Sequence, residues 1–288
     1  MIAPSSAQIT SQIQAEIARI HLNQADCTLQ ITPPLPSDVL PSSALRSILG
    51  WHLYEKHPRL FLDLFEPGKT HGHKPPALSF RGPLPAAGQD ICRFRISTWD
   101  HDAVLLPTLL DILQGLAGVP HPRYAIGHFQ LDSLSLAHPD PFPHAPGTGI
   151  FTMHGPLVKK EKLTNPDGSK QDHRVDAQCL TLQRIVSFTL FRLFELSHHY
   201  GSGTFDWRRY FPEQLAADCL GVDCEFQDIQ ARGLGPIYSK PMVSGVAGCA
   251  KIAHPGADLT TVLAAASLFG IGQNTVEGCG AASWCITP

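Results

Sequence analysis

The chain carries little charge for its size. Only 16% of its 288 residues are Asp, Glu, Lys or Arg, and the formal net charge at pH 7 is -3. This balance lacks the excess of Lys and Arg found in proteins with a large basic surface for nucleic acids. Any basic surface must therefore be local. Fifteen histidines add to it at low pH, because a histidine side chain becomes charged below about pH 6.5.

Long apolar runs are also missing. No stretch approaches the roughly 18 uninterrupted apolar residues that cross a bilayer. Residues 1–24 are polar and helical in pattern, without the charged and apolar regions of a secretory signal. A content of 43% hydrophobic residues can still build a buried core. We therefore expect a soluble, cytoplasmic protein that makes no contact with a membrane.

Several motifs of metal and hydrolase chemistry are absent as well. The eight cysteines include no CxxC pair, and Cys219 and Cys224 are not accompanied by a second pair at metal-ligand spacing. HExxH, GxSxG and the P-loop lysine motif do not occur. His71 and His73 lie in a loop without a neighbouring carboxylate triad, and the adjacent His198 and His199 point about 100° apart on a helix, so neither pair predicts a metal site. We predict reduced thiols, no metal and no cofactor.

Proline and glycine divide the chain. Four prolines and two glycines lie in residues 139–149, where they exclude a helix and a central strand. We predict a linker there, between a domain of residues 1–138 and a domain of residues 150–288.

The two domains show the same order of patterns. Alternating polarity predicts strands, and apolar residues at helical spacing predict helices. The first domain gives a strand, helix, strand, strand, helix and strand at residues 27–32, 42–57, 77–82, 91–99, 104–118 and 125–136. The second repeats that order at residues 149–155, 176–201, 221–233, 241–253, 259–269 and 281–286. We therefore predict an α+β protein of two tandem ferredoxin-like (RRM-like) βαββαβ domains.

A glycine-rich loop is expected between the last helix and the last strand. Residues 270–280 read GIGQNTVEGCG and contain Gly270, Gly272, Gly278 and Gly280. Glycine lets a backbone approach closely, which suits contact with a phosphate backbone. A tight helix-to-strand turn is the alternative explanation.

Residues 43–58 and 262–284 carry a resemblance to a known family. A glycine-rich loop before the last strand of a second ferredoxin-like half resembles the signature of the RAMP superfamily of CRISPR-associated proteins. Within it, the chain is most similar to the pre-crRNA-processing endoribonucleases, whose first helix looks like SALRSILGWHLYEKHP. Family members commonly have Lys or Arg after the first Gly-x-Gly and an aromatic residue inside the second. Here Gln273, Asn274 and Cys279 occupy those places, which fits a diverged subtype such as the processing subunit of a type IV system.

The resemblance implies a metal-independent endoribonuclease. A ribose 2′-hydroxyl attacks the adjacent phosphate, which leaves a cyclic phosphate and a 5′-hydroxyl, and the reaction needs a base and an acid. His52 is the first candidate and His57 the second, and Tyr54 and Lys56 are close enough in sequence to help orient or neutralise. Arg46 and Lys56 of the same helix are candidates for RNA contact. Because His52 shares the face of Leu45, Ile48 and Leu49, it is alternatively a histidine at the edge of the core.

Clusters of basic residues lie outside that helix. Residues 159–174 predict a basic hairpin around an NPDG turn, with a solvated loop as the alternative. Two arginines on the long second-half helix and two in the Trp207–Tyr210 cluster could contact helical RNA. The candidates for RNA contact are Lys159, Lys160, Lys162, Lys170, Arg174, Arg184, Arg192, Arg208 and Arg209.

Together these patterns predict a protein that binds the CRISPR repeat stem-loop and cleaves it to mature crRNA. It is expected to stay bound to that RNA together with other CRISPR effector subunits. Two alternatives remain open. One is a non-catalytic RAMP subunit that binds crRNA, and the other is a tandem ferredoxin-like small-molecule-binding protein, which the acidic balance favours.

Overall fold

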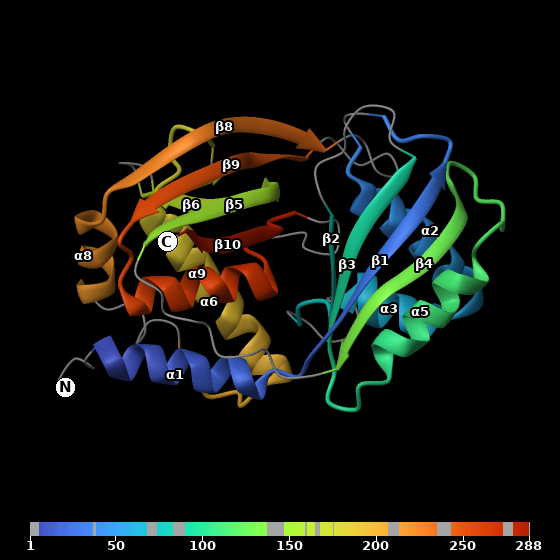
Figure 1. Cartoon of the computed structure of the whole chain (residues 1–288), viewed down its shortest axis with the longest axis horizontal. Coiled ribbons are helices and arrows are strands. Elements are labelled where there is room, and N and C mark those ends of the chain that lie inside the picture. Colours follow the sequence, from blue (N-terminus) through green and yellow to red (C-terminus); the bar gives the residue numbers. More distant parts are fainter. Residues whose placement is uncertain are drawn as a thin grey trace.

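The structure is a computed structural model of the whole chain. It describes residues 6–36, 39–67, 74–82, 90–136, 147–158, 160–164, 168–174, 176–206, 213–234, 243–272 and 279–287. Figure 1 shows two α/β halves side by side.

The first half contains one four-stranded antiparallel sheet. Its elements are β1 (Leu22–Thr32), α2 (Pro41–Lys56), α3 (Pro58–Phe65), β2 (Leu78–Arg81), β3 (Ile91–Trp99), α5 (Leu105–Gly115) and β4 (Ala125–Leu136). The strand order is β2-β3-β1-β4, with every pair antiparallel. The first and third strands are therefore central, as in a ferredoxin-like fold.

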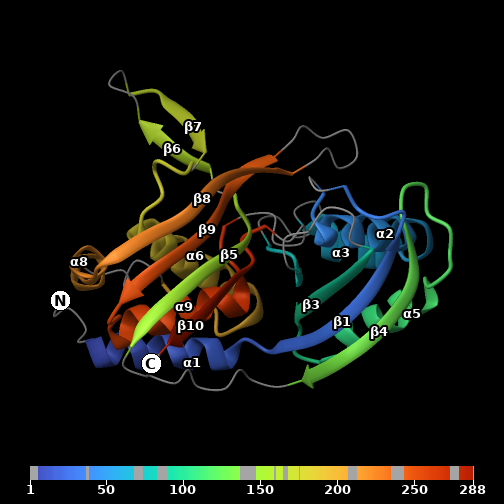
Figure 2. The same cartoon turned by 45° about the horizontal axis from the view of Figure 1, so that its top comes forward.

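The second half repeats this arrangement. Its elements are β5 (Thr148–Leu157), β6 (Lys160–Thr164), β7 (Lys170–Arg174), α6 (Leu182–Tyr200), α8 (Glu213–Gly221), β8 (Cys224–Leu234), β9 (Val243–Ala253), α9 (Ala257–Phe269) and β10 (Ala282–Thr287). The strand order is β10-β5-β9-β8. Strands β6 and β7 form a separate hairpin that projects from this half (Figure 2). The two matching sheets confirm the predicted α+β, tandem ferredoxin-like fold.

Alternation along the strands gives each sheet one buried face. Along β1, Ala25, Cys27, Leu29 and Ile31 are buried, while the residues between them are half-buried. The buried face packs on α2 and α5 in the core of the first half. Successive strand residues point to opposite faces, so the polar residues of β1 must face away from these helices.

Local signals set the ends of the long helix α6. The Thr181 hydroxyl accepts a hydrogen bond from the Arg184 N–H at 3.2 Å, which satisfies one unpaired donor of the first turn. At the other end, Gly201 follows Tyr200, and its N–H donates to the Ser197 carbonyl at 3.0 Å. The glycine stop expected from the sequence is therefore present.

Helix α1 (Ser6–Arg19) precedes β1 but packs with the second half. Ile13 and Ile17 lie one helical turn apart, and together with Ile20 they are buried in the core that contains α6 and α9. Figure 1 shows α1 below those helices, leading directly into β1 of the first half. The expected first domain, residues 1–138, thus includes a helix whose apolar side chains belong to the second core.

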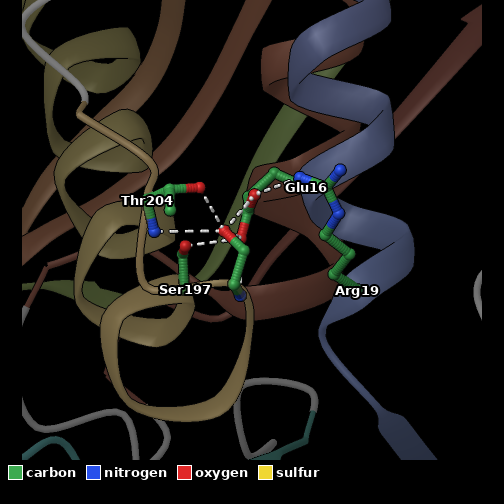
Figure 3. Close-up of polar contacts among 5 residues, drawn as sticks. Glu16, Arg19, Ser197 and Thr204 are labelled. Atoms are coloured by element: carbon green, nitrogen blue, oxygen red, sulfur yellow. Dashed lines mark hydrogen bonds and ion pairs between the residues drawn. The ribbon is translucent and has the colours of Figure 1, made fainter.

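A buried carboxylate attaches α1 to the end of α6. Glu16 is 3% exposed and accepts hydrogen bonds from the hydroxyls of Ser197 at 2.5 Å and Ser202 at 2.8 Å (Figure 3). The Ser202 N–H donates to the same carboxylate at 3.2 Å, and Arg19 pairs with it at 3.3 Å. Because its oxygens are satisfied, Glu16 can be buried at little cost.

Replacement of Glu16 should destabilise the protein. Glu16→Met keeps a similar length but leaves the buried Ser197 hydroxyl, the Ser202 hydroxyl and the Ser202 N–H without their acceptor, so we expect a loss of about 1–3 kcal/mol in unfolding free energy. Arg19→Gln is the matched control, since its side chain is 58% exposed and a surface ion pair contributes less than about 1 kcal/mol. Urea unfolding measures both. Equal stability of the two variants would contradict this role of Glu16.

Glycine is required where the 270–280 loop closes. Gly280 has a φ of 65°, and a Cβ there would lie 1.6 Å from the Ile271 carbonyl oxygen. We expect Gly280→Ala to lower the melting temperature by several degrees, because both strain and backbone displacement oppose the methyl group. Gly115→Ala, at the end of α5 with open space around it, should leave the melting temperature unchanged or raise it slightly. A harmless Gly280→Ala variant would refute the requirement.

Candidate functional site

The two histidines predicted for catalysis lie close together at the end of α2. The ring centroids of His52 and His57 are 6.0 Å apart. His52 is half-buried, whereas His57 is exposed at the junction where α2 ends and α3 begins. Burial lowers the pKa of His52, and the nearby His57 and Lys56 lower it further. His52 is therefore neutral at pH 7 and can accept a proton.

Tyr54 and Arg46 have other neighbours. Tyr54 is 66% exposed, and its ring meets the ring of Phe61 edge-on at 5.4 Å. Tyr54 lies two positions after His52 in the sequence, which places the two side chains about 200° apart around the helix. The Arg46 guanidinium lies 5.2 Å from the centroid of the Phe65 ring. These contacts pair His52 with His57 and place Tyr54 and Arg46 against α3.

The glycine-rich loop lies near the other end of α2. Leu40, Val158 and Cys279 form a small buried cluster, which places the end of the loop beside the first turn of α2. His52 follows Leu40 by twelve residues, or about 18 Å along a helix axis. The described contacts therefore do not bring this loop to His52.

The described glycines of the loop have backbone conformations that favour glycine. Gly270, Gly272 and Gly280 have φ values of 74°, 78° and 65°. Gly270 and Gly280 are buried, and the Gly280 N–H donates to the Pro156 carbonyl at 3.0 Å. These features fit the tight-turn explanation, in which glycine is needed for conformation and close packing. Gly278 lies outside the described residues.

A cleft of about 930 Å³ lies between the two halves. From the first half, the polar faces of β1, β3 and β4 line it, opposite the face covered by α2 and α5. From the second half, it is bounded by β5, the end of α9 and β10. Its polar and ring-bearing residues include Asp26, Thr28, Arg81, Arg93, Arg95, Gln130, Asp132, His154, Ser283 and Trp284.

The sequence reasoning missed this cleft. In the sequence, Arg93 and Arg95 alternate with Cys92, Phe94 and Ile96. This alternation indicates that the two arginines share the open face of β3. It could not show that this face meets a second domain.

His154 of β5 is the histidine of the cleft. One ring nitrogen, Nε2, lies 2.7 Å from the Ser283 hydroxyl oxygen on β10, and the side chain is half-buried. Burial lowers the pKa of His154, and the positive charge of Arg81 lowers it further. Its backbone N–H donates to the Ala281 carbonyl at 2.8 Å, directly after the glycine-rich loop.

Arg81 reaches from β2 of the first half to α9 of the second. Its guanidinium is buried, and Nη1 donates to the Ser267 carbonyl oxygen. Burial lowers the pKa of Arg81 to about 9, and repulsion from Arg95 and Arg192 contributes. Arg95 differs, because it holds Asp26 with two hydrogen bonds of 2.7 and 2.9 Å. That pairing lowers the pKa of Asp26.

The two arginines of α6 that were predicted to contact RNA interact with other residues of the protein. Arg192 is 4% exposed, with its guanidinium 5.5 Å from the centroid of the Trp99 ring and 3.8 Å from Glu195. This burial does not fit its predicted role in RNA contact, because a core position is closed to a ligand. Arg184 is half-buried and donates to the Cys179 carbonyl at 2.5 Å.

The predicted basic hairpin is formed by β6 and β7. In the antiparallel register of this hairpin, Lys160 lies opposite Arg174 and Lys162 lies opposite Asp172. Lys170 is the first residue of β7. Lys159, Arg208 and Arg209 lie outside the described residues, as do His71 and His73.

Within the described ranges, no three His, Cys, Asp or Glu side chains come together as a metal site would require. No helix there has the length and apolar character needed to cross a membrane. The eight cysteines are free thiols.

Comparison with known proteins gives structural neighbours only. No protein family model matches the chain, and no curated protein matches it. Among solved structures, a product complex of the Cas6 protein TTHB231 matches with 17% identity and a TM-score of 0.55, over 91% of this chain and 100% of that one. A RAMP protein binding different RNA substrates matches with 13% identity and a TM-score of 0.55, over 92% and 100%. A Cas6-related protein from Pyrococcus furiosus matches with 14% identity and a TM-score of 0.52, over 91% and 98%.

These matches span both halves of the chain. The arrangement of two ferredoxin-like sheets is therefore shared with them, and the chain has the fold of Cas6 and RAMP proteins.

Proposed function

We propose that this protein is a CRISPR RNA-processing endoribonuclease of the RAMP superfamily, which binds repeat RNA and cleaves it. The observation that carries the proposal is the arginine-bearing cleft between two ferredoxin-like sheets, in a chain whose structural neighbours include a RAMP protein binding RNA. Exposed cationic side chains on a polar sheet face suit a phosphate backbone. Such local charge is compatible with the net charge of -3.

The proposed reaction is metal-independent. His52 accepts the proton of a ribose 2′-hydroxyl, whose oxygen then forms a bond to the adjacent phosphorus. The bond from phosphorus to the 5′-oxygen breaks, and His57 gives that oxygen a proton. The products are a 2′,3′-cyclic phosphate and a 5′-hydroxyl. The support for this assignment is the 6.0 Å separation of the two rings and the lowered pKa of His52.

Substrate binding is proposed to use both sides of the first sheet. The histidine pair lies on the helix side of the first sheet, and the cleft lies on the opposite face. A bound RNA would therefore pass around the edge of that sheet. The β6–β7 hairpin carries Lys160, Lys162 and Arg174 at a projecting position (Figure 2), which suits a contact with the repeat stem-loop. We further propose that the cleaved RNA stays bound in the cytoplasm, with other CRISPR effector subunits.

A non-catalytic RAMP subunit is the second candidate. The half-burial of His52 on α2 favours it, because a histidine at the edge of a core can be purely structural. RNA binding would then persist without cleavage. A small-molecule-binding protein would show neither cleavage nor the steep salt dependence of phosphate contacts.

Cleavage of labelled repeat RNA in EDTA tests the enzyme. We expect His52→Ala to lower the single-turnover rate by about 10²- to 10⁴-fold and His57→Ala to lower it as well, because each removes a proton-transfer group. His254→Asn is the control, since His254 is exposed after β9 in the second half and asparagine tolerates its positive φ of 46°, and it should retain the wild-type rate. No cleavage by the wild type under these conditions would end the claim of an enzyme.

The cleavage rate should also depend on pH through His52. Burial and positive neighbours disfavour its charged form, so its pKa lies below 6.5, and the base is already neutral at pH 7. The rate should fall as the pH drops below 6.5, and the midpoint of that fall reports the pKa of the base. A pH–rate profile of the wild type measures it. A rate that does not fall at any pH below 6.5 at which the protein stays folded would contradict His52 as the base.

A further inference from the structure

A small pocket lies on the second sheet, apart from the histidine pair. Its volume is about 290 Å³, and its described lining residues come from β5, β8 and β9 of the second half. These three strands are neighbours in the sheet (Figure 1). We call it the second-sheet pocket, and its lining consists of Thr152, Met153, His154, Asp228, Gln230, Ala247, Gly248 and Cys249.

The second-sheet pocket opens on the sheet face opposite helices α6 and α9. Phe151 and Ala250 belong to the core that contains these helices. Thr152 and Cys249 are cross-strand partners one position away from them, so their side chains point to the other face. A ligand can therefore reach the pocket without entering the core. The pocket also adjoins the cleft, because His154 lines both.

A β-bulge brings Asp228 to this pocket. The register of β8 against β9 shifts between Gln227 and Gln230, where two residues of β8 lie opposite Gly248. Asp228 has a φ of 52°, in the left-handed region that Asp enters more readily than most residues. A Cβ at Gly248 would lie 2.9 Å from the Asp228 carbonyl oxygen, so glycine is needed beneath the bulge. Bulges redirect side chains, and this one leaves an exposed carboxylate in the pocket wall.

The chemistry of the lining favours a ligand with N–H donors. Asp228 is the one acid of the described lining, which contains no Lys or Arg. Its carboxylate accepts no hydrogen bond from a described residue. His154 adds no positive charge at neutral pH, because burial lowers its pKa. Asp228 would therefore repel a phosphate, whereas two neighbouring N–H groups would satisfy both of its oxygens.

We propose that the second-sheet pocket binds a guanine base, with the Asp228 carboxylate accepting hydrogen bonds from its N1–H and N2–H groups. The inference goes beyond the proposed function, because this site takes no part in cleavage. Guanine is the one common RNA base with two neighbouring N–H donor groups on its Watson–Crick edge. Adenine, cytosine and uracil have one such group each, and this edge is free for recognition when a base is unpaired.

The rest of the lining suits a base better than a cationic side chain. The Thr152 hydroxyl and the Gln230 amide can donate to the guanine O6 and N7 atoms. An arginine side chain also offers two parallel N–H groups, but it has no acceptor for these donors. Ala247 and Gly248 are small and leave room for a flat ring. The volume is close to the lower end of the range for small-ligand sites, which suits a single base.

The test compares guanine with hypoxanthine, which lacks only the N2 amino group. Calorimetry gives dissociation constants for GMP and IMP, and fluorescence anisotropy gives them for labelled UUGUU and for the same strand with inosine at its centre. We expect guanine to bind about 10- to 100-fold more tightly, because hypoxanthine leaves one carboxylate oxygen unpaired. A preference for GMP assigns the site to a free nucleotide. A preference between the strands alone assigns it to a base carried by RNA that enters from the cleft.

Asp228→Asn should abolish the preference for guanine. Asparagine keeps the size of the side chain and tolerates the positive φ, but it replaces one acceptor oxygen by an N–H donor. The affinity for guanine should fall about 10- to 100-fold, to the level of hypoxanthine. Asp223→Asn is the matched control, since Asp223 is exposed just before β8 and is not part of the lining. It should keep the wild-type preference.

Equal binding of guanine and hypoxanthine by the wild type, or no binding of any of these ligands, would overturn the inference. A preference that persists in folded Asp228→Asn would overturn the role of Asp228. If that variant does not fold, the wild-type comparison decides. Binding of L-argininamide without binding of GMP or UUGUU would assign the pocket to a cationic side chain and refute the base. Cleavage of repeat RNA is measured separately, so the proposed function stands or falls independently.

Discussion

The cleft depends on side chains that cross between the two halves and fix them against each other. Trp99, at the end of β3 in the first half, is fully buried in the core of the second half. Arg192 of α6 stacks on its ring, and Arg81 reaches the carbonyl of Ser267 on α9. Helix α1 adds a third connection, because it belongs to the second core and continues directly into β1. The cleft walls therefore keep a defined distance.

This arrangement explains how a chain with a slightly negative charge can present cations to a polyanion. Helices cover one face of each sheet, so the polar residues of the strands gather on the other face. In the first half, that face carries Arg93 and Arg95, and it borders the second half. Arginines on one polar sheet face are a local feature, which needs no basic excess over the rest of the surface.

The two proposed activities of the site are separated by one sheet. In the proposed function, His52 and His57 transfer protons on the helix side of the first sheet, and the RNA backbone lies along the arginine-bearing cleft on its other side. A separation of this kind allows binding to be weakened without loss of the chemical groups. Burial is the main cause of the lowered pKa of both His52 and His154, and charged neighbours add to it, His57 and Lys56 in the first case and Arg81 in the second.

The sequence by itself determined the two βαββαβ halves, because the period of the apolar residues and the glycine and proline stops are local properties. It also marked the β6–β7 hairpin, the glycine turn, and the alternation that puts Arg93 and Arg95 on one face. Only the tertiary structure decided that α1 belongs to the second core, that Arg192 is buried, and that His154 and Arg81 meet across the cleft. These outcomes arise from contacts between residues more than 70 positions apart, and a local pattern carries no information about such contacts.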